Sequence, residues 1–166
     1  PRECGIGTFT HNLYNAVTAA APNTELDESF IAAMNDFDQN YEYPKEVELT
    51  IRQESQKDYL SAVNYINLSG ADCCILEHEF GIYGGQNGVY ILPLLHRLEI
   101  PLIVTLHTII KTPSYNEKSI LQEICKMANR VVVMSRKAIG FLIDIYNVPK
   151  EKIAFIEHGV PDFKFS

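Results

Sequence analysis

Three short apolar segments of this chain each lead into a histidine, and this recurrence constrains the fold more than any other feature. The segments are residues 73–76, 102–106 and 153–156, and the histidines that follow them are His78, His107 and His158. Apolar segments of this length, separated by helical patterns, are typical of parallel strands. Parallel strands end at one edge of their sheet, where open α/β folds bind ligands. We therefore expect one cleft that contains all three histidines.

The spacing of apolar residues alternates between helix and strand patterns along almost the whole chain. Helical spacing marks residues 9–20, 59–66, 89–98, 120–128 and 138–145. Strand patterns mark residues 30–34, 47–51, 73–76, 102–106, 131–134 and 153–156, with a loop expected at 35–44. Alternation within 47–51 predicts an edge strand, whereas the unbroken run at 73–76 predicts burial on both faces. Together these patterns predict an α/β fold with a Rossmann-like, doubly wound, mostly parallel sheet in three layers.

Composition and charge narrow the class of partner. The 166 residues suffice for one domain, and an apolar content of 46% argues against disorder. A net charge of −7 without a long basic run argues against nucleic acid as the main partner. We find neither a signal peptide nor an apolar stretch long enough for a membrane span. The four cysteines contain no CxxC pair, which predicts reduced thiols and a cytoplasmic location.

The two ends of the sequence have the character of a fragment. The chain opens without an initiator methionine, and a glycine pair, Gly5 and Gly7, comes within its first ten residues. Because a glycine turn of this kind normally follows a strand, we expect the natural chain to extend before Pro1. The segment after His158 resembles the start of a connection, so we also expect a further segment after Ser166.

The glycine pair itself has two interpretations. Two glycines ahead of a helix let a phosphate approach the backbone N–H groups at the helix N-terminus. The alternative is a tight turn that needs positive φ. A dinucleotide fingerprint would require a third glycine where Thr10 stands, so a nicotinamide-dependent dehydrogenase is not favoured.

A second glycine-rich segment, residues 81–85, follows His78 and Glu79 directly. These two side chains could orient a sugar hydroxyl or act as a base, and the alternative is a solvated strand end. Lys111 lies four residues beyond His107, where it could meet a phosphate at the same edge. A lone His107 would often be a core histidine with its hydrogen bonds satisfied, but three histidines at neighbouring strand ends favour a functional site.

Two other chemistries fit the sequence less well. His78, His107, His158 and Glu79 are suitable metal ligands, but their spacing matches no zinc signature. Ser135 follows a strand pattern, but it lacks the flanking glycines of a hydrolase nucleophile. We expect Ser135 to be the N-cap of the helix that follows.

Five segments in order resemble the amino-terminal domain of a GT-B glycosyltransferase, most closely the group 1 set, glycosyltransferase family 4. They are residues 1–9, 78–85, 105–108, 132–135 and 158–161. The resemblance implies one of two Rossmann-like domains that face each other across a cleft. It also implies retaining transfer of a hexose from a GDP- or UDP-sugar to a glycan or lipid-linked acceptor, in polysaccharide biosynthesis, without a metal or other cofactor. The alternative is a non-catalytic module that binds a sugar or nucleotide.

The resemblance also implies roles for single residues. It places Gly5, Ile6 and Gly7 at the donor diphosphate, where the position of Lys111 in the sequence would add a cation, and it places His107 and Glu79 at the reacting groups. It places His78, Gly84 and Gly85 at the acceptor, and His158 and Gly159 at the passage to a second domain. The family's first strand would precede Pro1, and its donor-binding carboxyl-terminal domain would follow residues 1–166. That missing domain is an expected partner, and a lipid-linked acceptor implies peripheral association with a membrane.

Overall fold

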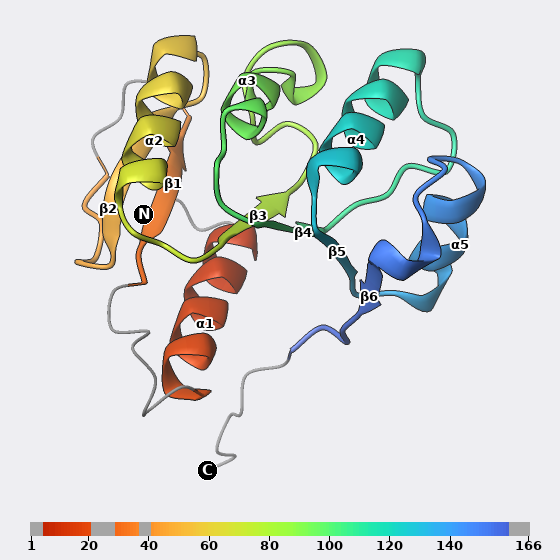
Figure 1. Cartoon of the computed structure of the whole chain (residues 1–166), viewed down its shortest axis with the longest axis horizontal. Coiled ribbons are helices and arrows are strands. Elements are labelled where there is room, and N and C mark those ends of the chain that lie inside the picture. Colours follow the sequence, from red (N-terminus) through yellow and green to blue (C-terminus); the bar gives the residue numbers. More distant parts are fainter. Residues whose placement is uncertain (1–4, 21–28, 37–40, 160–166) are drawn as a thin grey trace.

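A computed structural model of the chain describes residues 5–20, 29–36 and 41–159, and its helices and strands form three layers (Figure 1). On one side of the strands lie α2 (Gln56–Leu68), α3 (Ile91–His96) and α4 (Tyr115–Met127). On the other side lies α1 (Gly5–Ala20), and α5 (Arg136–Asp144) lies beside the last strand. None of the helices in these residues is long and apolar enough to cross a membrane.

All strand pairs in the described residues are parallel, but the strands form two sheets. A two-stranded sheet pairs β1 (Ile31–Asn35) with β2 (Val47–Arg52). A four-stranded sheet has the order β3 (Cys74–His78), β4 (Leu102–Leu106), β5 (Arg130–Val133) and β6 (Ile153–Phe155). The predicted Rossmann-like α/β fold is thus confirmed, with its parallel strands divided between these two sheets. In the described residues, no strand lies between β1 and β3 to join the two sheets by hydrogen bonds.

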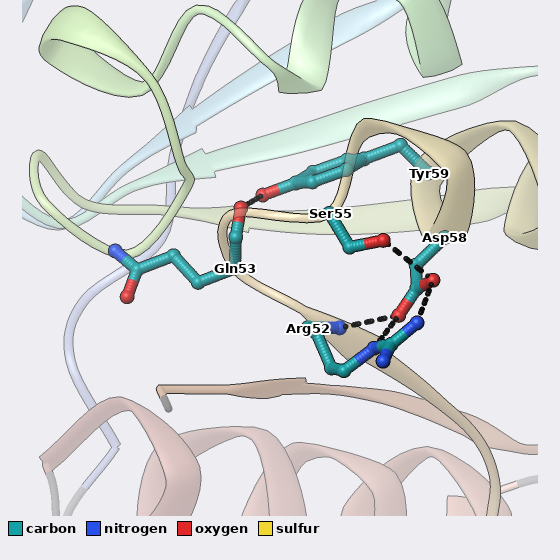
Figure 2. Close-up of polar contacts among 5 residues, drawn as sticks. All are labelled: Arg52, Gln53, Ser55, Asp58 and Tyr59. Atoms are coloured by element: carbon teal, nitrogen blue, oxygen red, sulfur yellow. Dashed lines mark hydrogen bonds and ion pairs between the residues drawn. The ribbon is translucent and has the colours of Figure 1, made fainter. Parts of the chain in front are cut away.

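Loop contacts, in place of a strand ladder, connect the carboxyl end of β2 to the loop after β3. The hydroxyl of Tyr59 donates to the carbonyl of Gln53 at 2.9 Å (Figure 2) and accepts from the backbone N–H of Gly84 at 2.9 Å. The side-chain amide of Gln53 donates to the carbonyl of Gly81 at 2.8 Å. Because Tyr59 is buried in α2, these bonds hold the two loops against the same helix.

The first turn of α2 is held by a carboxylate that collects several donors (Figure 2). Asp58 accepts from Nε and Nη2 of Arg52 at 2.7 and 2.9 Å, and from the hydroxyl of Ser55 at 2.7 Å. The Arg52 bonds are the largest cause that lowers the pKa of Asp58 below its usual range. The end of β2 and the start of α2 are therefore fixed relative to each other.

The helical faces predicted from sequence form the core on one side of the sheets. The buried residues of α2 are Tyr59, Ala62, Val63 and Ile66, and those of α4 are Ile120, Leu121, Ile124 and Cys125. A capping box between Ser114 and Glu117 defines the start of α4, because each side chain bonds the other residue's backbone N–H. Helix α3 covers Ile91–His96, which is shorter than the predicted range of 89–98, and a separate 3-10 turn at residues 86–88 precedes it.

The prediction that residues 73–76 are buried on both faces is wrong. Cys73 is exposed and Ile75 is 41% exposed, whereas Leu76 is buried. Ile75 lies on the face of β3 that α1 covers, and no residue of α1 is buried. The described residues thus cover one face of the four-stranded sheet fully, and the face toward α1 incompletely. Residues 1–4 and 160–161 of the resembling segments lie outside the described part of the chain.

Candidate functional site

A glutamate and a histidine from neighbouring strands meet at the carboxyl edge of the four-stranded sheet. Glu77 lies opposite Thr105 in the β3–β4 register, and His107 is the first residue after β4. Nε2 of His107 lies 2.8 Å from Oε2 of Glu77, and the hydroxyl of Thr105 donates to Oε1 of Glu77 at 3.3 Å. The backbone reinforces this contact, because the N–H of His107 donates to the carbonyl of His78 at 3.0 Å.

The Glu77–His107 pair is largely withdrawn from solvent. The two side chains are 9% and 11% exposed, respectively. Charge interactions in such a setting are stronger than on an open surface, because water screens them less. A carboxylate in this position fixes both the orientation of an imidazole ring and the nitrogen that carries its proton. The pair can therefore present a defined ring atom to a bound molecule.

Helix α1 contributes an aromatic ring to the same site. The ring of Phe9 meets His107 edge to face at 4.8 Å between centroids, and it meets His158 at 5.4 Å. His158 is exposed and follows β6, and its Nδ1 lies 2.7 Å from the carbonyl oxygen of Gly159. The structure thus brings two of the three predicted histidines together, on the face of the sheet that α1 covers.

The glycine pair belongs to α1 itself, which corrects the expectation that it precedes the helix. Gly5, Ile6 and Gly7 form the first described turn of α1, and neither glycine has positive φ. The tight-turn interpretation is therefore wrong. A Cβ at Gly5 would meet no atom of the described residues within 4 Å, so their packing does not require glycine there. The anion interpretation stays a prediction, which the positive end of the helix dipole favours.

Glu79 connects the loops that follow β3 and β4. Its Oε2 accepts from the hydroxyl of Thr108 at 2.6 Å, and its Oε1 accepts from the backbone N–H of Phe80 at 2.8 Å. The carboxylate is thus bonded to Thr108, the residue that directly follows His107 in the sequence. A carboxylate oxygen can accept more than one hydrogen bond, so Glu79 can still bind a further hydroxyl.

His78 does not join the other two histidines, which corrects the expectation of a cleft with all three. Its side chain is 2% exposed and lies on the opposite face of β3, beside the rings of Phe80 and Tyr83. Its Nδ1 has no hydrogen-bond partner in the described part of the chain. Burial, and to a smaller degree His107, lowers the pKa of His78 to about 4. In this position His78 offers an acceptor molecule no exposed atom.

Gly84 and Gly85 have a packing role that the sequence did not reveal. A Cβ on Gly84 would overlap the carbonyl oxygen of Gln53 and would lie 2.8 Å from the ring of Tyr90. Gly85 has a φ of +74°, and a Cβ there would lie 2.6 Å from the same ring. Close packing therefore accounts for both glycines, and their contact with an acceptor stays a prediction.

A comparison with known protein families identifies the chain. The model of Glycosyltransferase Family 4 matches residues 80–162, which is half of the chain. The chain belongs to Glycosyltransferase Family 4. The match includes His107, His158 and the loops after β3 and β4, and it indicates a transferase. A search of curated proteins finds no match to the chain.

The remaining predicted residues of this family 4 domain lie at separate positions. Lys111 is exposed in the connection between β4 and α4. Ser135 is the N-cap of α5 as expected, although its side chain makes no capping bond. The four potential metal ligands do not converge, because His78 faces away, and the described residues contain no group of three or more such side chains that could hold a metal.

Glu77, Thr105 and Phe9 are site residues of the family 4 domain that the sequence analysis missed. The signal for Glu77 and Thr105 was present in strand alternation. Thr105 precedes His107 by two residues and therefore shares its face, whereas Glu77 precedes His78 by one residue and must face the other way. Adjacent strands β3 and β4 then bring Glu77 to His107. No comparable signal marked Phe9, because its contact depends on where α1 packs.

Proposed function

We propose that this chain is the acceptor-side domain of a retaining GT-B glycosyltransferase. It takes part in the transfer of a hexose from a GDP- or UDP-sugar to a glycan or lipid-linked acceptor. The observation that carries this proposal is the largely buried Glu77–His107 pair at the carboxyl edge of a parallel sheet, in a chain of Glycosyltransferase Family 4. Ligands of open α/β sheets bind at this edge.

The reaction requires stabilisation of the negative charge that develops on the departing diphosphate. Backbone N–H groups of Gly5, Ile6 and Gly7 would supply it, because fixed dipoles stabilise a developing charge without reorganisation. The contact of Phe9 with His107 supports this role, since it places α1 beside the histidine. Lys111 would add a mobile positive charge to the same end of the sheet.

The two sides of the reacting bond would meet different groups. His107 orients the transferred sugar, and Glu79 orients the acceptor hydroxyl from the neighbouring loop. His158 and Gly159 lead toward a second, carboxyl-terminal domain that binds the nucleotide. In this proposal no metal or other cofactor is needed. The enzyme works in the cytoplasm, at the membrane surface when its acceptor is lipid-linked.

The decisive experiment is a transfer assay with the full-length protein. GDP- and UDP-sugars are supplied with a glycan and lipid extract, and release of the nucleoside diphosphate is measured together with the mass of the product. We expect His107→Ala to lower the rate by about 10²- to 10⁴-fold, the usual range for a positioned catalytic side chain. His96→Ala is the matched control, because His96 is exposed on α3 and its Nε2 lies 3.6 Å from Oε1 of Glu123, away from the Glu77–His107 pair in the sequence.

Two outcomes would contradict the proposal. An unchanged rate in His107→Ala would remove this histidine from the reaction. Binding of a nucleotide sugar without transfer to any acceptor would instead support a non-catalytic binding module.

A further inference from the structure

The two carboxylate oxygens of Glu77 have different partners, and these contacts indicate which ring nitrogen of His107 carries the proton. Oε1 accepts from the hydroxyl of Thr105 at 3.3 Å, and Oε2 lies 2.8 Å from Nε2 of His107. An ionised carboxylate can only accept hydrogen bonds. Nε2 must therefore carry a proton, and in the neutral ring the lone pair is then on Nδ1.

The surroundings hold the ring in this orientation. Phe9 meets the ring edge to face at 4.8 Å, and the His107 side chain is 11% exposed. Nδ1 has no hydrogen-bond partner among the residues that the structure describes. A ring nitrogen that is oriented but unpartnered at a ligand-binding edge is suited to accept a bond from an incoming molecule.

The other charged and titratable groups near the pair do not compete for Glu77. Glu79 bonds Thr108 and the backbone of Phe80. His78 faces the other side of β3 and stays neutral at pH 7, because burial lowers its pKa to about 4. His158 contacts the site through the ring of Phe9. Glu77 therefore acts on His107 alone among these groups.

We infer that Glu77 is a positioning residue that holds the proton of His107 on Nε2, so that Nδ1 accepts a hydrogen bond from a hydroxyl group of the transferred sugar. The second half of this inference rests on the proposed function. An ether or carbonyl oxygen could not replace the hydroxyl, since neither has a proton to donate. The site would thus select a free hydroxyl at one position of the sugar.

Nitrogen-15 NMR of the histidine rings tests the first half on the chain itself, without any substrate. We expect a ring N–H proton of His107 that exchanges slowly and correlates with Nε2. It should disappear in Glu77→Leu and persist in Glu77→Gln, whose amide oxygen can still accept. Glu48→Gln is the control, because Glu48 is exposed and accepts from Tyr65 on α2. A slowly exchanging proton on Nδ1, or a spectrum unchanged in Glu77→Leu, would overturn the role of Glu77.

Transfer by the full-length protein tests the second half. In Glu77→Leu, kcat should fall about 10²-fold, the effect of a misplaced reacting group, whereas Glu77→Gln should retain most of the rate. Folding is checked separately by the amide spectrum of each variant. A change in KM alone, or an equal loss in both variants, would contradict positioning through a hydrogen bond.

Donors with single hydroxyls removed identify the partner of Nδ1. One deoxy donor should lose at least about 10-fold in kcat/KM with the unmodified protein, the cost of one unpaired polar group. In His107→Ala, the same deoxy donor and the unmodified donor should have similar kcat/KM values, because the histidine that would bind the hydroxyl is gone. The donor with a methoxy group at that position should be equally poor. If every deoxy donor loses equally in both proteins, the hydroxyl assignment is wrong. If no donor supports transfer, the proposed function fails, while the NMR result on Glu77 still stands or falls alone.

Discussion

Glu77 and His78 are neighbours in β3, yet only the side chain of Glu77 contacts the ring of His107. The carboxylate of Glu77 lies 2.8 Å from Nε2 of His107, and His78 is buried on the opposite face beside Phe80 and Tyr83. Strand alternation causes this separation. The candidate site therefore lies on the face of the sheet that α1 covers, and the other face is core.

The close contact of Gly84 with Gln53 predicts a strict size limit. Gly84→Ala should lower the free energy of unfolding by about 1–3 kcal/mol, because its methyl group would overlap the Gln53 carbonyl. Gly140→Ala is the control, since a Cβ in that part of α5 meets nothing within 4 Å and alanine favours a helix. Urea unfolding measures both. Equal stability of Gly84→Ala and the unmodified chain would show that the loop can move away.

A lysine closes the carboxyl end of α4. Nζ of Lys152 donates to the carbonyls of Lys126 and Ala128 at 2.8 Å each, and to that of Cys125 at 3.2 Å. Lys152→Met should lower the free energy of unfolding by about 1–3 kcal/mol, because it leaves these acceptors without their charged donor. Thermal unfolding measures the loss. Lys150→Met, at an exposed position of the same turn, should change stability little, and an equal effect in both variants would argue against the cap.

Local patterns in the sequence predicted most of the fold because they depend on neighbouring residues alone. All four residues expected on the buried face of α2 are buried, and β4 has the predicted bounds of Leu102–Leu106. The predicted burial of Ile75 was wrong, because the burial of a strand residue depends on the layer that packs on its face. Helix α1 covers the face of Ile75 incompletely. The division into two sheets is likewise a property of strand pairing, which spacing along the chain does not encode.

The sequence predicted those parts of the candidate site that depend only on parallel strands ending at the same edge of the sheet. His107 and His158 were expected together, and Phe9 indeed contacts both rings. The position of His78 required a choice of face, which the apolar run before it left open. Gly5 and Gly7 were predicted to precede the first helix, whereas they lie inside it. Glycine is compatible with both a turn and a helix, so the sequence did not decide between them.

The pair between Asp58 and Arg52 predicts a pH dependence of stability at acid pH. The pKa of Asp58 is lowered in the folded chain, mainly by Arg52, so its contribution is present above the unfolded value of about 4 and is lost as pH falls toward the lower folded value. Asp58→Asn should be less stable at pH 7 by about 1 kcal/mol, the range of a good bidentate surface pair. Urea unfolding at pH 7 and pH 3 should show this difference shrinking. A constant difference would contradict the linkage.

His78 predicts a separate dependence in a higher pH range. Burial lowers its folded pKa to about 4, below the unfolded value of about 6.5, so protonation favours the unfolded chain. The contribution of neutral His78 is complete above the unfolded value and is lost as pH falls from there toward 4. Between pH 7 and pH 5 the free energy of unfolding should decrease by about 2 kcal/mol from this group.

His78→Phe tests this contribution with a ring of similar shape that does not titrate. At pH 8 the variant and the unmodified chain should differ little, because the neutral imidazole already occupies an apolar position beside Phe80 and Tyr83. At pH 5 the variant should be the more stable of the two. Urea unfolding across this range measures the difference, and parallel pH profiles would mean that His78 takes up its proton without opening the core.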